Sequence, residues 1–199
     1  MCLFIETICY SKGQFQQIDL HNARCNRTRN HFFGPLPVIQ FELILIVPFH
    51  LKEETVKCSV TYEKDILSIE YARYQIRPVQ SLQLVCDDSI EYGFKYADRT
   101  KLNQLFGLRG QSDDILIVKN GFITDTSYAN IVFSKAGKWY SPQNPLLYGT
   151  RINNYFRQGG VTPALLRPED LHLFSEARIV NAMIALEDSP VIPVEKILY

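Results

Sequence analysis

The feature that most constrains the fold is a hairpin signal in the middle of the chain. Two apolar runs rich in β-branched residues, 115–118 and 122–124, are separated by Lys119-Asn120-Gly121. Asn-Gly at this position favours a tight turn, because both residues tolerate the positive φ angles that the turn requires. Similar short runs bounded by turn residues fill much of the remaining sequence, so many short strands are expected.

The same patterns predict an α+β fold of two lobes. Helices are expected at 20–32 after an N-cap at Asp19, at 99–106 after Asp98, at 150–158 before Gly159-Gly160, and briefly from Pro168. Residues 39–47 fit either a buried strand or a short helix. Further strands are expected at residues 3–10, 14–18, 56–62, 67–71, 81–85, 129–134, 139–140, 179–186 and 191–194. The smaller lobe is expected to cover residues 1–80, and the larger lobe residues 81–199.

Composition excludes several classes of protein. The chain has 199 residues, 46% of them hydrophobic, and its 21 Lys and Arg balance its 21 Asp and Glu. Without a net positive field, neither nucleic acid nor an anionic membrane is an expected partner. The longest apolar run, 41–47, is far shorter than the roughly 20 residues of a bilayer span. The start of the chain lacks the features of a signal peptide.

The five cysteines are scattered, at Cys2, Cys9, Cys25, Cys58 and Cys86. No two have the spacing of a zinc site or a redox pair, so no metal site is expected. An odd, scattered set is typical of reduced thiols, and a cytoplasmic location is therefore expected.

Four features could carry chemistry. Lys95 is flanked by aromatic residues; it could lie along apolar surface, or it could be a desolvated amine able to form an imine. Asp125 follows a predicted strand, where it could be an ordinary turn residue or could hold a cationic ring nitrogen. Gly149-Thr150 opens a predicted helix whose free N–H groups could bind a phosphate. Arg24, on the first helix, could bind the same phosphate in a bidentate manner. An amine, an acid and a phosphate clamp together are what pyridoxal 5′-phosphate requires.

The ordered motifs resemble those of a known family. The run 125–133, then Ser141-Pro142 and residues 147–151, is similar to the signature of class IV aminotransferases, the fold-type IV pyridoxal phosphate enzymes. These include aminodeoxychorismate lyase and the branched-chain and D-amino acid aminotransferases. The similarity extends over nearly the whole chain, from residues 4–8 through the His-x-x-Arg pattern ending at Arg24 to residues 190–194.

The resemblance implies a role for each matching residue. Lys95 would be the Schiff-base lysine and would move the proton between the substrate and the cofactor. Asp125 would pair with the pyridine nitrogen. The phosphate would be bound by Arg24, Gly149, Thr150, Asn181 and Ala182. A homodimer acting on a small-molecule substrate is also implied.

Two departures from the family pattern bear on activity. Asp125 stands where the family usually has Glu, and the chain starts where relatives already have a strand and a loop facing the active site. Asn181-Ala182 slightly favours a lyase-like activity on aminodeoxychorismate over an amino acid aminotransferase. A non-catalytic relative that binds a phosphorylated ligand is a further alternative. Arg73 and Arg77 could bind a substrate carboxylate, or could point outward from a strand.

Overall fold

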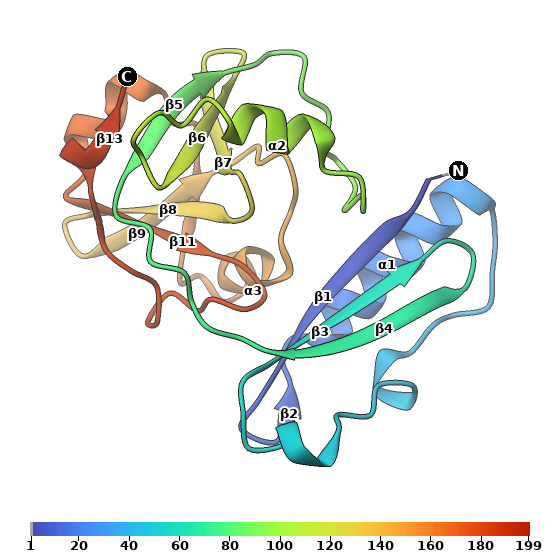
Figure 1. Cartoon of the computed structure of the whole chain (residues 1–199). Coiled ribbons are helices and arrows are strands. Elements are labelled where there is room, and N and C mark those ends of the chain that lie inside the picture. The colour runs from blue at the N-terminus through green and yellow to red at the C-terminus, as the bar shows by residue number, and fades with distance from the viewer. Residues whose placement is uncertain (1) are drawn as a thin grey trace. The chain divides into compact units, whose positions relative to one another are not determined.

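The computed structural model describes residues 2–199 and divides into two compact units. The first unit runs to Gln75 and also contains Phe94–Asp98, whereas the second contains Ile76–Gly93 and Arg99–Tyr199. Each unit combines strands with helices (Figure 1), so the expected α+β class is confirmed. The boundary differs from the expected one. The segment around Lys95 hydrogen-bonds to the first strand of the first unit and belongs to that unit, not to the larger lobe.

The first unit is a four-stranded antiparallel sheet with one long helix (Figure 1). Its strands are β1 (Phe4–Ser11), β2 (Gln14–Phe15), β3 (Val56–Tyr62) and β4 (Ile66–Arg73), in the order β2-β1-β3-β4, and its helix is α1 (Ile18–Phe33). Gln17 takes a left-handed conformation with φ 46° and is the N-cap of α1. The predicted strand at 14–18 is therefore cut short, and Asp19 lies in the first helical turn instead of capping it.

Alternate residues of β1 and β3 form the core of this unit. Phe4 and Ile8 are fully buried on β1, and Val60 lies opposite Glu6 on β3. Phe4 also packs against Phe32 of α1, with ring centroids 4.8 Å apart. Because side chains on a strand alternate between faces, Glu6 lies on the same buried face as Phe4 and Ile8.

The segment between α1 and β3 contains two 3-10 helices, Phe41–Leu43 and Phe49–Leu51. This resolves residues 39–47, for which a strand and a short helix were both possible. Asn22 of α1 anchors the segment by accepting a 2.9 Å hydrogen bond from the Phe41 N–H. Four apolar side chains of this segment are 71–87% exposed: Val38, Leu43, Ile46 and Phe49. We refer to these four residues as the apolar patch.

The second unit is built on a nine-stranded sheet. The path β10-β9-β8-β7-β6-β5-β13 is joined by β11, which pairs with both β8 and β12. The strands are β5 (Leu82–Cys86), β6 (Asp114–Lys119), β7 (Phe122–Thr126), β8 (Asn130–Lys135), β9 (Lys138–Pro142), β10 (Thr162–Ala164), β11 (Glu176–Val180), β12 (Ile192–Pro193) and β13 (Ile197–Leu198). The helices are α2 (Thr100–Phe106), α3 (Thr150–Gln158) and the 3-10 helices Pro168–Leu173 and Val194–Lys196.

The predicted central hairpin is confirmed as β6 and β7. Asn120 and Gly121 connect the two strands with φ angles of 52° and 76°, the positive values that such a turn requires. Helix α3 has the predicted bounds, and Gly159 ends it at φ 72°. Helix α2 starts one residue later than predicted: its N-cap is Arg99, not Asp98, and no side chain caps it.

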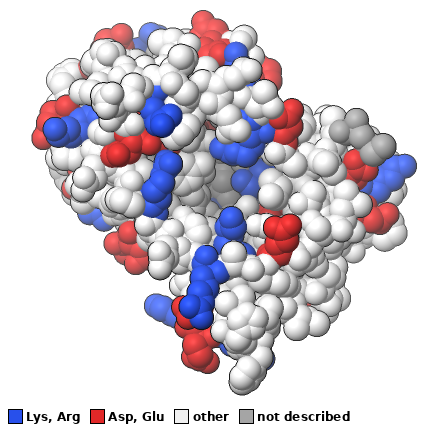
Figure 2. Space-filling model, viewed as in Figure 1, with Lys and Arg blue, Asp and Glu red and all other residues white. Residues whose placement is uncertain are grey.

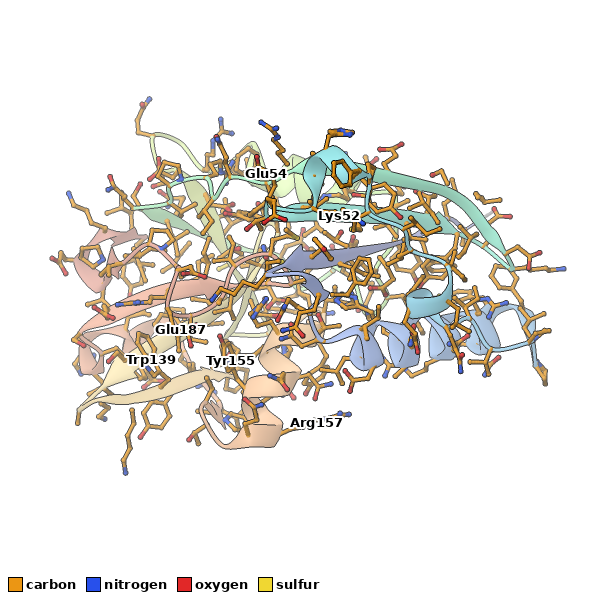
Figure 3. The ribbon with its side chains drawn as sticks, turned by 90° about the horizontal axis from the view of Figure 1, so that it is seen from below. Lys52, Glu54, Trp139, Tyr155, Arg157 and Glu187 are labelled. Carbon is orange, nitrogen blue, oxygen red and sulfur yellow. The ribbon has the colours of Figure 1, made fainter. Side chains whose placement is uncertain are left out.

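Helix α3 is fastened to the sheet by an apolar cluster. Ile152 packs with Val132 of β8 and Val180 of β11, all fully buried. At the outer end of the helix the Tyr155 hydroxyl accepts a hydrogen bond from the Leu186 N–H and lies 3.4 Å from a Glu187 carboxylate oxygen (Figure 3). These contacts hold α3 in a fixed position relative to β8 and β11.

The surface carries charges of both signs. On the face drawn in Figure 2, Lys, Arg, Asp and Glu side chains lie among uncharged residues, and several of the Lys and Arg side chains are grouped near its centre. Among residues 2–199, no helix is long and apolar enough to cross a membrane.

Candidate active site

A buried ionic cluster joins α1 to β1 in the first unit. Arg24 donates from Nε to Oε1 of Glu6 at 2.8 Å and from Nη2 to Oε2 at 2.6 Å. His21, one helical turn earlier, has Nδ1 2.6 Å from the same Oε2. Glu6 and His21 are fully buried, and Arg24 is 6% exposed. One carboxylate therefore orients both side chains of the His-x-x-Arg pattern.

The ionisation states follow from this packing. Burial alone would raise the pKa of Glu6, but the charge and hydrogen bonds of Arg24 and the hydrogen bond of His21 lower it to about 2. Burial lowers the pKa of His21; the hydrogen bond and charge of Glu6 oppose this shift, and the Arg24 and Lys95 charges add to it. His21 is then neutral, and because an ionised carboxylate can only accept, its Nδ1–H must be the donor. The two Nη1 protons of Arg24 are donated to no described residue of the protein.

Lys95 belongs to this same unit. Its carbonyl accepts a 3.0 Å hydrogen bond from the Ile5 N–H, and the next residue, Tyr96, pairs with Phe4 of β1. The charge of Lys95 is close enough to lower the pKa of His21. The structure thus places Lys95 near His21, which shares the Glu6 carboxylate with Arg24.

Asp125 is the centre of a second cluster, in the second unit. It lies at the end of β7, is 6% exposed, and has both oxygens occupied. Oδ1 accepts from Asn130 Nδ2 at 2.7 Å and Oδ2 from the Leu147 N–H at 3.0 Å. Burial raises the pKa of Asp125 to about 7, although the hydrogen bonds from Leu147 and Asn130 oppose the shift. A cationic ring nitrogen beside this carboxylate would favour its ionised form.

The start of α3 is two residues from this cluster. Gly149 is the N-cap, Thr150 is the first helical residue and is 3% exposed, and no side chain caps the helix. The first N–H groups of a helix have no acceptor within it, and they carry the positive end of the helix dipole. This end of α3 has the donors and the polarity that a phosphate group requires.

Arg151 connects this helix to the predicted turn at Asn181-Ala182. It donates from Nε to the Asn181 carbonyl at 2.8 Å and from Nη2 to the Ala182 carbonyl at 2.7 Å. The predicted strand at 179–186 is wrong beyond Val180, where β11 ends. The chain turns there because the Asn181 side chain accepts from the N–H groups of Met183 and Ile184. The Asn181 side chain is therefore committed to the turn.

The two predicted substrate arginines have different surroundings. Arg73 of β4 is exposed and makes a 3.4 Å ion pair with Glu54 on the surface. Arg77 is half exposed, pairs with the buried Asp114 at 3.3 Å, and lies 5.1 Å from the ring centroid of Tyr128. Of the two, Arg77 is the one whose position is fixed by a buried partner and an aromatic ring.

Sequence reasoning assigned no role to Glu6, Asn130 and Arg151. The sequence could have indicated Glu6, because it is a charged residue at a position of β1 whose neighbours on the same face, Phe4 and Ile8, are apolar and buried. Arg151 directly follows Thr150, and Asn130 lies five residues after Asp125, but the partners of both become visible only in the folded chain.

Comparison with known proteins identifies the family. The family described as amino-transferase class IV matches residues 92–197, and the chain belongs to this family. An uncharacterized protein of Haemophilus influenzae is 37% identical over 180 residues, covering 89% of this chain and 96% of that protein.

Solved structures share the fold. A protein of Haemophilus somnus proposed to be a 4-amino-4-deoxychorismate lyase has a TM-score of 0.86 at 28% identity, covering 94% of this chain and 98% of that one. A hypothetical aminotransferase of Mycobacterium tuberculosis, in a PLP-bound form, has a TM-score of 0.79 at 13% identity, covering 96% and 80%. The predicted fold-type IV architecture is thereby confirmed.

Proposed function

We propose that the protein is a pyridoxal phosphate-dependent enzyme. The observation that carries the proposal is the hydrogen bond from the Leu147 N–H to the buried Asp125 carboxylate, only two residues before the N-cap of α3. A partner for a ring nitrogen and a phosphate-binding helix start thus belong to one network. When bound, the cofactor supplies an electron sink for the carbanion formed at the substrate Cα.

The residues present fit this cofactor. The donors proposed for the phosphate dianion are Arg24 in the first unit and, in the second, the N–H groups at Gly149, Thr150 and Ala182. The N-terminus of α3 lacks a side-chain cap, so its donors are not taken by its own N-cap residue. Asp125 supplies the carboxylate for the ring nitrogen, and Asn181 forms the turn that presents Ala182. The PLP-bound form of the Mycobacterium tuberculosis relative supports the choice of cofactor.

Lys95 is the amine in this proposal. Its Nζ would hold the cofactor covalently and would move a proton at the substrate Cα. Glu6 and His21 act on it indirectly: the negative Glu6 carboxylate balances Arg24, and His21 stays neutral beside the Lys95 charge. Arg77 is proposed to bind a substrate carboxylate; Arg73, which is exposed and paired with Glu54, is the weaker candidate.

The reaction is proposed to be lyase-like, with aminodeoxychorismate as the substrate. The match to the Haemophilus somnus protein, which spans nearly the whole of both chains, supports this choice. Amino acid transamination is the alternative, supported by the family that the chain belongs to. The two reactions share the proton transfer at Cα and differ in what leaves the substrate.

The test is product formation by protein loaded with pyridoxal phosphate. The proposal predicts pyruvate and 4-aminobenzoate from aminodeoxychorismate, with little pyridoxamine phosphate formed when amino acids are offered. Pyridoxamine phosphate formed from amino acids, without pyruvate and 4-aminobenzoate from aminodeoxychorismate, would favour the aminotransferase over the lyase. Protein that stays colourless and takes up no pyridoxal phosphate would contradict both and favour the non-catalytic alternative.

We infer further that the protein is a cytoplasmic homodimer. Its buried cysteines Cys25 and Cys58 are free thiols, as is usual in a reducing compartment. The apolar patch offers an exposed surface that a second subunit could cover.

A further inference from the structure

Asn130 joins two parts of the second unit that have separate proposed tasks. It lies on β8 directly opposite Asp125 on β7. Its Nδ2 donates to Asp125 Oδ1 at 2.7 Å and to the Leu147 carbonyl at 2.9 Å. Both hydrogens of the amide group are therefore used, one on the carboxylate and one on the chain leading into α3.

The other end of the same amide lies against Gly149. A Cβ atom at Gly149 would be 2.3 Å from Asn130 Oδ1, far closer than any van der Waals contact allows. The backbone of Gly149 is ordinary, with φ −63° and ψ 149°, so its conformation does not require glycine. Glycine is required here because the Asn130 side chain occupies the space that a Cβ would need.

The chemistry of the network explains why this residue is asparagine. A carboxylate and a carbonyl must each receive a hydrogen bond from one short side chain, and a primary amide has two donors. An ionised aspartate has none, and its oxygen would face the Asp125 carboxylate. Serine has one donor and could satisfy only one of the two acceptors. The same two acceptors fix which end of the amide faces them, since a flipped amide would bring oxygen against oxygen.

We propose that Asn130 is a positioning residue that sets the Asp125 carboxylate and the start of α3 relative to each other. The inference rests on the proposed function, in which these two groups bind opposite ends of one cofactor. Asn130 itself need not touch the cofactor. Its amide fixes the spacing between the ring-nitrogen partner and the phosphate-binding N–H groups.

A double-mutant cycle tests the contact. Gly149→Ala alone is expected to lower the Tm of the cofactor-free protein by several degrees, because the new methyl group meets Asn130 Oδ1. In the Asn130→Ala background the same substitution is expected to have little effect, since the obstructing oxygen is gone. Equal effects of Gly149→Ala in both backgrounds would contradict the contact. Asn154→Ala, on α3 and half-buried, is the matched control and should leave the cost of Gly149→Ala unchanged.

Cofactor binding tests the positioning role. Asn130→Ala is expected to weaken pyridoxal phosphate binding by about tenfold or more, the loss typical of hydrogen bonds to a charged group. The same substitution is also expected to weaken the binding of pyridoxal, which lacks the phosphate. It should further shift the pH at which the absorption band of the bound cofactor changes. A purely structural role would lower the Tm without moving that pH. Wild-type protein that binds no pyridoxal phosphate would contradict the proposed function itself. If the wild type binds the cofactor and Asn130→Ala binds it with the same affinity and the same pH profile, the role of Asn130 is contradicted.

Discussion

The guanidinium of Arg24 meets the carboxylate of Glu6 through two hydrogen bonds, from Nε to Oε1 at 2.8 Å and from Nη2 to Oε2 at 2.6 Å. Glu6 is fully buried and Arg24 nearly so, so neither charge could be accommodated without the other. The pairing uses one edge of the guanidinium and leaves Nη1 for a ligand. A buried carboxylate thus orients an arginine that is proposed to bind phosphate.

Replacing Glu6 should therefore destabilise the protein strongly. We expect Glu6→Gln to lower the free energy of unfolding by about 3–5 kcal/mol, because it leaves the Arg24 charge buried without its counter-ion. Urea unfolding of the cofactor-free protein measures this. Glu54→Gln, which removes the exposed partner of Arg73, is the matched control and should cost no more than about 1 kcal/mol. Similar losses in the two variants would contradict the importance of the buried pair.

The pH dependence of stability should report the buried Asp125. The pKa of Asp125 is raised from 3.8 to about 7, so between these values the folded protein keeps a proton that the unfolded chain releases. The contribution of Asp125 to the free energy of unfolding must then fall as the pH rises, by about 2 kcal/mol between about pH 5 and pH 7.

Asp125→Asn removes this titration and should flatten the pH profile of the cofactor-free protein over that range. Glu6 does not confuse the measurement, since its folded-state pKa of about 2 and its unfolded value of 4.5 lie below the range. Unfolding curves collected at several pH values provide the test. A profile with the same slope in wild type and Asp125→Asn would mean that Asp125 is ionised in the folded protein.

Arg151 should matter for cofactor affinity through the turn that it holds. Arg151→Ala removes the two hydrogen bonds to the carbonyls of Asn181 and Ala182, so the turn that is proposed to bind the phosphate is no longer fastened to α3. We expect pyridoxal phosphate to bind about tenfold more weakly, with a much smaller effect on pyridoxal. Equilibrium titration followed by absorbance measures both.

Arg157 provides the control on the same helix. It is exposed, and in Figure 3 its side chain extends away from Tyr155 and Glu187. Arg157→Ala should leave both affinities unchanged. A loss of pyridoxal affinity as large as the loss of pyridoxal phosphate affinity in Arg151→Ala would argue that the turn does not serve the phosphate.

The apolar patch should determine the oligomeric state. Phe49 is 87% exposed and Ile46 79% exposed, so charged residues there cost little in an isolated subunit. The double substitution Ile46→Glu and Phe49→Glu should convert a dimer into a folded monomer in sedimentation velocity. Leu67→Glu, at a 58% exposed position on β4, should leave the dimer intact. A dimer that survives the double substitution would place the interface elsewhere.

Local signals predicted the parts of the fold whose conformation is decided locally. The β6–β7 turn follows from Asn120-Gly121, and the bounds of α3 follow from the residues at its two ends. Predictions failed where a distant contact or an unusual backbone conformation decides the structure. The left-handed Gln17 starts α1 before Asp19 can cap it, and the Asn181 side chain ends β11 by turning the chain.

The candidate site divides in the same way. Residue types and their order predicted Lys95, Arg24 and Asp125 as candidates, because the cofactor requires an amine, a cation and an acid. The partners that orient them were not predictable, since Glu6 is 18 residues from Arg24 and Leu147 is 22 residues from Asp125 along the chain. The pairing of Lys95 with β1 also joins residues far apart in sequence, so its place in the first unit required the folded structure.

The central claim is that Lys95 is the amine that binds the cofactor. The most direct measurement is borohydride reduction of the protein loaded with pyridoxal phosphate, followed by peptide mass mapping. The account predicts that the reduced cofactor is found on the peptide containing Lys95 and that Lys95→Ala takes up no label. Label on another lysine, or equal labelling of the Lys95→Ala variant, would contradict it.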